Sequence, residues 1–529
     1  MQALFSFGNE FTKKFKYSFF YFLKIIKLHR MGFFVRDLSE GGKGLIIQMA
    51  GVVFCVMLIF PGMVKAGGSG GDDRGAPGYW YSGDTPGLID PAKSPLVFVH
   101  GYNNSSAVWH EGNDMYEVAL ANGYETAFID LHPDRDMWAN GVMLAEKLEE
   151  IYNHFGGKKL VIIGYSKGGV DTQTALVHYG AHQYVSNVIS LSSPHHGTQL
   201  ADLAHSSAAW WLAALLGNNN EATESLQTGN MQYFRTITDT HVNAAKNQYY
   251  TLGGTRWGSF GSPSYWGGLY LSQYGKNDGV VTTINSRLPG AAIAQEGSWN
   301  HTTIREGSYT FQAFRPYTTV THPSSLASAS KETPTYKPSI HSIVKGGKAV
   351  NALNDHFAVE ENVKSMTVSF LSNRNLSSLK LTGPDGKAFK TKKIYKEASE
   401  FFKGAWVHQF EMDAPEAGTW SLEGPGKASY LYTVSLDSPL NETLQKKAGI
   451  MNSNKTYKTK WTHFGFDSTG KKLQKKKKGE KDGLIADSDF KQEGVYNVTT
   501  EVRGVTSNGK PFERTIIESF YVNKHGERQ

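Results

Sequence analysis

One serine of this chain has the neighbours that a catalytic nucleophile needs. An apolar segment, 159–163, leads into Gly164–Gly169, which matches the pattern G-x-S-x-G around Ser166, and a segment of helical character follows over 170–177. A strand, a tight turn and a helix in this order force the serine into a strained backbone conformation, and the glycines avoid a collision at the bend. The strain holds the hydroxyl at a helix N-terminus, whose N–H groups stabilise developing negative charge. Ser166 is therefore the predicted nucleophile.

The pattern is not specific by itself, because the chain contains 56 glycines. Gly67–Gly71 also matches it, around Ser69. That second match lies in a glycine-rich run, with no apolar strand before it and no helix after it. Only Ser166 has the strand–turn–helix context of a nucleophile.

A serine nucleophile needs a base that accepts its proton and a carboxylate that orients the base. When the serine lies on such a turn, the acid and then the histidine follow it along the chain. Asp278, in an Asn-Asp-Gly turn, and His301, 23 residues later, satisfy this order. Asp239 and Asp202 are alternative acids, and His301 is one of 18 histidines. Order and spacing together favour Asp278 and His301.

The residues around these side chains alternate between strand-like and helix-like segments. Continuous apolar runs predict strands over 95–99, 124–130, 160–163 and 185–191. A helix is predicted over 137–155, where apolar residues recur at helical spacing. Strands that are apolar on both faces, alternating with helices, indicate a parallel sheet covered on both sides. We expect such an α/β domain over residues 67–320.

The second half of the chain has the pattern of all-β domains. Between 318 and 338 the composition changes to Thr, Ser, Pro, Ala and Lys, which indicates a linker. Beyond it, short strand-like segments alternate with turn residues, namely 366–370, 379–381, 419–422, 430–436, 495–502 and 516–522. After a linker at 321–340, we therefore expect a β-sandwich at 341–437 and a second, Ig-like sandwich at 438–529.

The positive charge of the chain is concentrated in its first 66 residues. The formal net charge is +7. Residues 1–66 hold nine Lys and Arg against three Asp and Glu, and the remainder holds 46 against 45. A remainder this close to neutral lacks the basic surface that binding to nucleic acid requires. No nucleic-acid partner is expected, and 40% hydrophobic residues are enough for a sizeable globular core.

Residues 1–66 have the layout of a secretion signal. Basic residues recur up to Lys43, an apolar run follows over 45–60, and Val64–Ala66 supplies small residues at alternate positions for a signal peptidase. Pro61 and Gly62 interrupt the apolar run too soon for a comfortable membrane span. We expect a secreted, extracellular protein. A retained anchor, with cell-surface association, is the alternative.

The only cysteine, Cys55, lies within this leader. Phe54 stands where a lipid-attachment signal has a small residue, so a lipoprotein is not expected. The predicted mature chain contains no cysteine and hence neither a disulfide nor thiolate chemistry. Met31 is an alternative start of the chain.

Four motifs in the first part of the chain occur together in one enzyme family. They are Val97–Gly101, Gly164–Gly169, Ser193–Thr198 and Asn277–Val281. In this combination the chain resembles the secreted bacterial lipases of the α/β-hydrolase superfamily, over roughly residues 90–310. The resemblance implies an α/β-hydrolase fold, with a mostly parallel sheet and helices on both of its faces, and an esterase active site.

The resemblance also implies an oxyanion hole and bears on metal binding. In these lipases, the turn after the first motif strand and the residue after the nucleophile each donate a backbone N–H; here these are Tyr102 and Lys167. Each such donor contributes about 3 kcal/mol to transition-state stabilisation. The side chain of Lys167 is expected to be a solvated charge. Several of these lipases bind calcium through an aspartate two residues after the catalytic histidine; Thr303 stands there, so no metal or other cofactor is expected.

Three further segments, a histidine pair, an apolar segment and a lysine run, also lead to structural predictions. His195 and His196 are adjacent on a loop and should pack beside the nucleophile turn rather than bind a metal. The segment 201–217 is apolar almost all round and is predicted to form a lid or acyl-binding helix, with a plain buried helix as the alternative. Its candidate substrate contacts are Trp210, Trp211, Leu212 and Leu215. The run Lys475–Lys478 should be a solvated hairpin loop, with contact to an anionic cell surface as the alternative.

These observations favour a secreted serine hydrolase of carboxylic esters, either a triacylglycerol lipase or a carboxylesterase. Its partners would be a lipid or polyester substrate and, transiently, a lipid interface. One alternative is an extracellular polyhydroxyalkanoate depolymerase whose β domains grip the polymer. Another is a surface adhesion protein with a silent hydrolase domain. The sequence does not indicate what the β domains bind.

Overall fold

The computed structural model describes residues 75–319, 339–398, 400–446, 455–467, 472–473, 476–483 and 487–529. The predicted leader, the second G-x-S-x-G match and most of the predicted linker lie outside these ranges. Within the described residues, no helix combines the length and the apolar character needed to cross a membrane.

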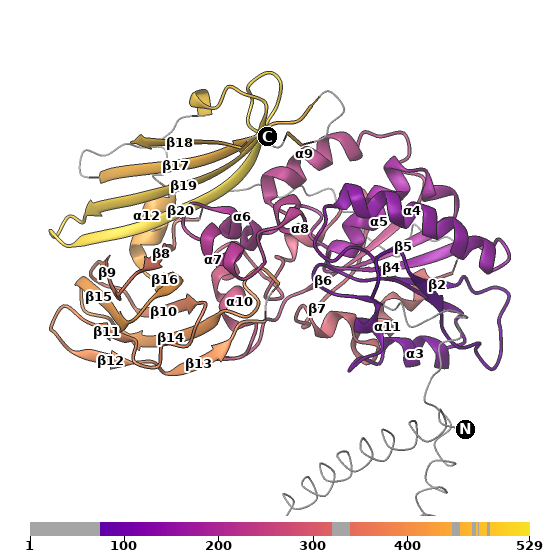
Figure 1. Ribbon diagram of the computed structural model, residues 1–529, viewed down its shortest axis with the longest axis horizontal. Coiled ribbons are helices and arrows are strands. Elements are labelled where there is room, and N and C mark those ends of the chain that lie inside the picture. Colours follow the sequence, from indigo (N-terminus) through magenta and orange to yellow (C-terminus); the bar gives the residue numbers. More distant parts are fainter. Residues whose placement is uncertain are drawn as a thin grey trace, which may run out of the picture. The chain divides into compact units, whose positions relative to one another are not determined.

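The first part of the described chain forms a seven-stranded sheet, in the order β1-β3-β2-β4-β5-β6-β7 (Figure 1). Its strands are β1 (Trp80–Ser82), β2 (Leu96–Val99), β3 (Thr126–Ile129), β4 (Leu160–Tyr165), β5 (Val185–Leu191), β6 (Gln248–Gly254) and β7 (Ala292–Gly297). β1 is antiparallel to β3, and all other neighbours are parallel. The predicted mostly parallel sheet is confirmed.

Helices cover both faces of this sheet, because its central strands are apolar on both sides. On one face, Val97 and Val99 pack with α4 (Met137–His154) and α5 (Lys167–His178). On the other, Phe98 packs with η1 (Ser106–Trp109), α3 (Met115–Ala121) and α11 (Gly307–Phe314). Short 3-10 helices lie in the connections: η2 (Ala181–Gln183), η3 (Ile284–Ser286), η4 (Thr303–Arg305) and η5 (Arg315–Tyr317).

Five helices, four between β5 and β6 and one between β6 and β7, form what we call the cap region. They are α6 (Gln199–His205), α7 (Trp210–Leu215), α8 (Glu221–Ser225), α9 (Thr228–Thr238) and α10 (Tyr265–Ser272). Their apolar residues, among them Leu200, Leu212 and Trp266, share one buried core with residues of the C-terminal half such as Leu371 and Phe402. The two halves of the chain therefore pack against each other through a continuous apolar interface.

Residues 339–437 form the predicted β-sandwich. Its five-stranded sheet has the order β13-β14-β10-β16-β8 and its four-stranded sheet the order β12-β11-β15-β9. The strands are β8 (Ser342–Ala349), β9 (Ala352–Val359), β10 (Ser365–Ser372), β11 (Lys380–Thr382), β12 (Ala388–Lys390), β13 (Lys393–Lys396), β14 (Trp406–Asp413), β15 (Gly418–Pro425) and β16 (Ala428–Asp437). Alternate residues such as Val368, Phe370 and Trp420 form the core between the sheets.

The last part of the chain differs from the expected second sandwich. Its described residues form a single antiparallel sheet, in the order β18-β17-β19-β20, with α12 (Pro439–Lys446) before it. The strands are β17 (Lys455–Phe464), β18 (Lys477–Asp482), β19 (Gly494–Val505) and β20 (Pro511–Val522), and η6 (Asp487–Asp489) precedes β19. Leu444 of α12 packs with Val502 and Phe512, so a helix covers apolar strand residues that a second sheet would cover in a sandwich.

A buried ion pair joins this last sheet to the sandwich. Arg514 of β20 and Glu360, which follows β9, are both almost fully buried, and an Nη1–Oε2 bond of 3.0 Å connects them. Asn441 of α12 accepts from Arg514 Nε at 3.1 Å, and Ser438 donates to Glu360 at 2.5 Å. Burial alone would raise the pKa of Glu360, but the guanidinium and the Ser438 hydroxyl lower it.

Replacing Arg514 by alanine is expected to lower the free energy of unfolding by about 3 to 5 kcal/mol, because Glu360 would remain buried without its partner. Pairing lowers the pKa of Glu360 in the folded protein. The ion pair therefore contributes to the free energy of unfolding at pH values above the ordinary pKa of glutamate, and this contribution is lost as the pH falls through the lowered pKa. Urea denaturation at neutral pH measures the loss. Arg503→Ala, which removes the ion pairs of a largely exposed guanidinium with Glu501 and Glu513, serves as the control and should cost less than about 1 kcal/mol. Equal costs would contradict the assignment.

Candidate active site

Ser166 lies at the sharp turn between β4 and α5. Its backbone has φ 50° and ψ −129°, in the left-handed region that residues other than glycine rarely adopt. A Cβ on Gly168 would stand 2.3 Å from the His100 carbonyl oxygen, so the turn can approach the β2 end only with glycine there. The strained turn expected from the sequence is confirmed.

The structure brings the two other predicted side chains to this serine. Asp278 follows β6 and His301 follows β7, so both lie beyond the carboxyl ends of parallel strands, as Ser166 does. The His301 Nε2 atom is 3.1 Å from Ser166 Oγ, and its Nδ1 atom is 2.6 Å from Asp278 Oδ2. The three side chains therefore form one hydrogen-bonded chain. Asp239 and Asp202, the alternative acids, pair elsewhere, with Arg235 and Thr228 respectively.

The backbone fixes the orientation of the acid. Asp278 Oδ1 accepts from the N–H groups of Val280 and Val281, at 2.9 and 2.8 Å, which leaves Oδ2 for the imidazole. The His301 N–H donates to the Asp278 carbonyl at 3.0 Å and ties the two loops together. The two residues directly after the Asn-Asp-Gly turn supply these N–H groups, so the chain at the turn also supports the carboxylate.

Two backbone N–H groups beside the serine have no acceptor within the described chain. They belong to Tyr102 and Lys167, the predicted oxyanion donors. Gly101 lies against the serine, since a Cβ there would be 3.4 Å from Ser166 Oγ. Lys167 is the first residue of α5, where a free N–H is normal. The arrangement leaves two donors unpaired at the nucleophile.

The side chain of Lys167 is not the solvated charge that the sequence led us to expect. It is buried and forms a 2.6 Å ion pair with Asp171, one helical turn further along α5. Asn140 donates to the same carboxylate at 2.9 Å. The sequence prediction missed this pair because the lysine and aspartate could equally have lain on an exposed helix face.

His195 and His196 pack beside the nucleophile turn, as expected. Both are buried, and His195 Nε2 is 2.7 Å from Ser190 Oγ on β5. Burial lowers the pKa of both rings, to about 3 for His196, so they are neutral at physiological pH. They contribute packing to the floor of the site.

The candidate lid helix α7 lies between the catalytic core and the C-terminal half. Leu212 is fully buried, whereas Trp210 and Leu215 are about half exposed. Trp211 is partly buried, and its Nε1 donates to the Tyr430 carbonyl of β16 at 3.4 Å. The all-round apolar character of this segment thus has a structural reason, because one side faces the core and another faces the β-sandwich.

One acidic side chain in the site has no counterpart in the sequence analysis. Glu400, from the loop between β13 and β14, accepts a 3.3 Å hydrogen bond from Ser166 Oγ through Oε2. Its Oε1 atom is 3.5 Å from His301 Nε2. No pattern around Glu400 distinguishes it from the other acidic residues of a β domain, and it lies 234 residues from Ser166. The C-terminal half therefore reaches into the centre of the site.

The two residues after Glu400 fill the space beside the triad. The Phe401 ring stacks against Tyr102, with ring centres 6.2 Å apart. The Phe402 ring meets Trp266 of α10 edge-on, with ring centres 5.1 Å apart. Both phenylalanines are fully buried, and Ser166 is only 1% exposed. In this structure the C-terminal half covers the triad completely.

The charge on His301 follows from these neighbours. Burial alone would lower its pKa, but the carboxylates of Asp278 and Glu400 outweigh burial and raise the pKa to about 10. With Glu400 in place, the imidazole is therefore protonated at neutral pH. A protonated imidazole cannot accept a proton from the Ser166 hydroxyl.

Lysines between β17 and β18, and one within β18, also contact the catalytic half. Lys472 and Lys476 both pair with Glu224 of α8, the latter at 2.5 Å. Lys478 lies over the Trp210 ring, 5.1 Å from its centre. The expected solvated loop at Lys475–Lys478 is thus, in its described part, a contact between the two halves.

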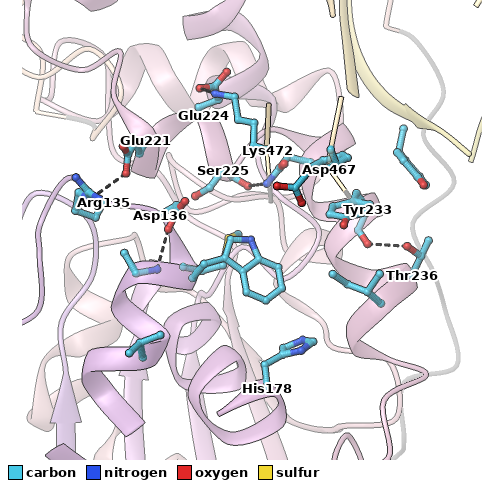
Figure 2. A pocket seen from close by; sticks show the side chains of 18 of the residues that line it. Arg135, Asp136, His178, Glu221, Glu224, Ser225, Tyr233, Thr236, Asp467 and Lys472 are labelled. Carbon is cyan, nitrogen blue, oxygen red and sulfur yellow. Dashed lines mark hydrogen bonds and ion pairs between the residues drawn. The ribbon is translucent and has the colours of Figure 1, made fainter. Parts of the chain in front are cut away.

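A cavity of about 1170 Å³ lies near this contact and away from the triad (Figure 2). Residues of the catalytic half such as Arg135, His178 and Tyr233 line it together with Asp467 and Lys472, which come between β17 and β18 in the chain. Ser166, Asp278 and His301 are not among its lining residues. This cavity is therefore a gap between the two halves of the chain, and the triad does not line it.

Comparisons with known proteins identify the family of the chain. Residues 94–281 match the family model of the alpha/beta hydrolase fold. The crystal structure of Bacillus licheniformis lipase BlEst2 in propeptide form is 44% identical, with a TM-score of 0.77, and the match covers 86% of this chain and 99% of that chain. The mature form of the same lipase is 54% identical over 46% of this chain and 100% of that chain, with a TM-score of 0.45. No curated protein matches the chain by sequence. The extent of the first match shows that the chain belongs to the α/β-hydrolase lipases and esterases.

Proposed function

We propose that this chain is the precursor of a secreted carboxylic ester hydrolase, in which Ser166 is the nucleophile, His301 the base and Asp278 its orienting acid. The observation that carries the proposal is the hydrogen-bonded chain from Ser166 through His301 to Asp278. The strained turn at Ser166 and two free N–H groups beside it complete the arrangement that acyl transfer requires.

The reaction follows from the geometry in two steps. Ser166 Oγ attacks the ester carbonyl while His301 Nε2 takes its proton, and the N–H groups of Tyr102 and Lys167 stabilise the oxyanion. His301 then protonates the leaving alcohol, and the acyl group remains on Ser166. In the second step His301 takes a proton from water, the hydroxide attacks the acyl carbonyl, and the acid leaves as Ser166 recovers its proton.

The surroundings of the triad favour an ester with large apolar groups. Tyr102 and Trp266 border the space that Phe401 and Phe402 occupy. Once the phenylalanines leave, this space becomes available to acyl and alcohol groups of similar size. A triacylglycerol lipase or carboxylesterase fits this lining, and the structure that matches most of the chain is described as a lipase.

The C-terminal half acts in this proposal as an inhibitory segment that is removed by proteolysis. It buries the triad, and the matching lipase was crystallised in a propeptide form. A secreted enzyme made in this way would stay inactive until it has left the cell, which agrees with the leader that the sequence predicts at residues 1–66. The contact with the triad also supports an inhibitory β region over one that grips a polymer or serves adhesion.

Cleavage of the linker is expected to raise ester hydrolysis by at least about 100-fold at high dilution, because it removes the effective concentration that tethers the two halves. A recognition sequence for a specific protease, inserted between Thr319 and Ser339, allows the cut. Hydrolysis of short- and long-chain aryl esters is then measured at decreasing protein concentration. The uncut chain with the same insertion is the control, and its specific activity should not change on dilution.

The substrate is identified with the same cleaved protein. Emulsified triglyceride and granules of polyhydroxyalkanoate are offered in parallel with the aryl esters. Hydrolysis of triglyceride supports a lipase, of aryl esters alone a carboxylesterase, and clearing of the granules the polymer depolymerase. A cleaved, folded chain that hydrolyses none of them would refute the proposed function.

A further inference from the structure

The loop that carries Glu400 is built to hold one conformation. The backbone closes it twice, through Glu397 N–H to the Ala405 carbonyl at 2.8 Å and Gly404 N–H to the Glu397 carbonyl at 2.9 Å. It is also fixed to the catalytic half, since Asn218 Nδ2 donates to the Lys403 carbonyl at 3.4 Å. A bulky loop alone would suffice to cover the site, so the carboxylate at its tip needs a separate explanation.

The position of this carboxylate corresponds to a stage of the ester reaction. When the acyl-enzyme is hydrolysed, the new carboxyl group lies between the serine oxygen and the imidazole, and the acid gives up its proton. Glu400 has the same two partners, with Oε2 at the Ser166 hydroxyl and Oε1 at His301 Nε2. Phe401 and Phe402 follow directly and place apolar groups on both sides, as a bound product would.

The groups that face His301 make the charge of Glu400 matter. Asp278 contacts one ring nitrogen and Glu400 the other, and the Tyr165 ring of β4 lies 5.1 Å from the imidazole. Arg305 of η4 lies over the same Tyr165 ring, 5.3 Å from its centre. An imidazolium between two carboxylates is favourable, whereas a neutral imidazole would leave Glu400 facing a lone pair.

We propose that Glu400 is a tethered analogue of the carboxylic acid product, and that its negative charge, in addition to the bulk of the loop, keeps the precursor inactive by holding His301 as the imidazolium. The inference rests on the proposed function, because it takes His301 as the catalytic base. It identifies the ligand of the closed site as a carboxylate, and it explains why an acidic residue occupies the loop tip.

Glu400→Gln tests the charge without changing the bulk. The probe is phenylmethanesulfonyl fluoride, acting on the uncut full-length chain. Ser166 Oγ bonds to the sulfur, the sulfur–fluorine bond breaks, fluoride leaves, and the hydroxyl proton passes to His301, so the neutral imidazole is required. Mass spectrometry of the labelled peptide gives the rate of modification between about pH 6 and pH 11.

In the wild-type chain, modification is expected to be slow at neutral pH and to rise toward the raised pKa of His301, about 10. The sign follows from linkage: the ion pair stabilises the closed state below the ordinary pKa of histidine, and this contribution is lost as the pH rises through the raised value. In Glu400→Gln the midpoint should move down by at least one pH unit, which makes modification at about pH 7 at least about tenfold faster.

Glu397→Gln is the matched control, because Glu397 is a buried acid on the same loop and the polar contacts of the triad do not include it. Its pH profile should coincide with that of the wild type. Identical profiles for Glu400→Gln and the wild type would overturn the proposal and leave occlusion as the only mechanism. If Glu400→Gln does not fold, a wild-type midpoint in the ordinary histidine range would overturn it as well.

The experiment separates this inference from the proposed function. If the cleaved enzyme hydrolyses esters while Glu400→Gln labels like the wild type, only the product-analogue inference fails. If Glu400→Gln is labelled faster while the cleaved enzyme acts on no ester, the Glu400 carboxylate does inhibit Ser166 but the proposed function fails.

Discussion

Ser166→Ala in the cleaved protein is expected to lower kcat for ester hydrolysis by about 10⁶-fold, the order of magnitude found when a nucleophile of this kind is removed. The hydroxyl is the atom that bonds to the acyl group, and among the described residues the contacts of His301 Nε2 are with Ser166 Oγ and Glu400. Initial rates on an aryl ester, with the processed wild type measured in parallel, give the ratio.

The chain supplies its own control for this variant. Ser69 also lies in a G-x-S-x-G match, but in a glycine-rich run whose sequence predicts neither a strand before it nor a helix after it. Ser69→Ala should leave kcat unchanged in the same assay. Residual activity of Ser166→Ala above about one per cent of wild type would place the nucleophile elsewhere, because positioning effects alone do not sustain such rates.

The fold of the catalytic half could be predicted because its signals are local. The run ending at Ile163 is apolar on both faces, which only a covered parallel sheet accommodates, and the glycines around Ser166 allow only a tight turn. The order of Asp278 and His301 after the serine then sufficed to choose them from several candidates. The chain order was informative because Ser166, Asp278 and His301 come after the parallel strands β4, β6 and β7, whose carboxyl ends meet at one edge of the sheet.

Glu400 could not be predicted in this way. Its contact with the triad depends on how two regions that are far apart in the sequence pack together, and such packing leaves no periodicity in the sequence. The same holds for Lys476, which appeared to be a solvated charge and pairs with Glu224 across the interface. The single sheet of the last region was missed because an apolar strand face has the same pattern whether a sheet or a helix covers it.

The cap region is a second case in which packing between the two halves could not be predicted from the sequence. Trp210 and Trp211 predicted a lid because apolar residues surround the helix. The structure explains the excess by a protein partner, since Trp211 donates to Tyr430 of the sandwich. Removal of the C-terminal half would expose this face, so a contact with a lipid interface and a contact with the inhibitory segment can use the same residues in succession.

Asp278→Asn is expected to lower kcat of the cleaved enzyme by about 10⁴-fold while the fold is retained. The amide oxygen can replace Oδ1, which accepts from Val280 and Val281, but the group facing His301 Nδ1 no longer carries the charge that stabilises the imidazolium. The base then loses its orientation and its preferred tautomer. Burst and steady-state rates on an aryl ester measure acylation and turnover separately, and both should fall.

The pH profile decides whether the carboxylate acts through His301. In the cleaved wild type Glu400 has left the site, so the apparent pKa for kcat/KM reports the imidazole paired with Asp278 alone. Of the two carboxylates that raise the pKa of His301 in the intact chain, Asp278→Asn then removes the one that remains. The apparent pKa should therefore be lower in Asp278→Asn. Asp239→Asn, at an alternative acid that pairs with Arg235, should change neither kcat nor the apparent pKa. A large loss in Asp239→Asn with full activity in Asp278→Asn would transfer the role of the acid to Asp239, which the 2.6 Å contact between Asp278 and His301 argues against.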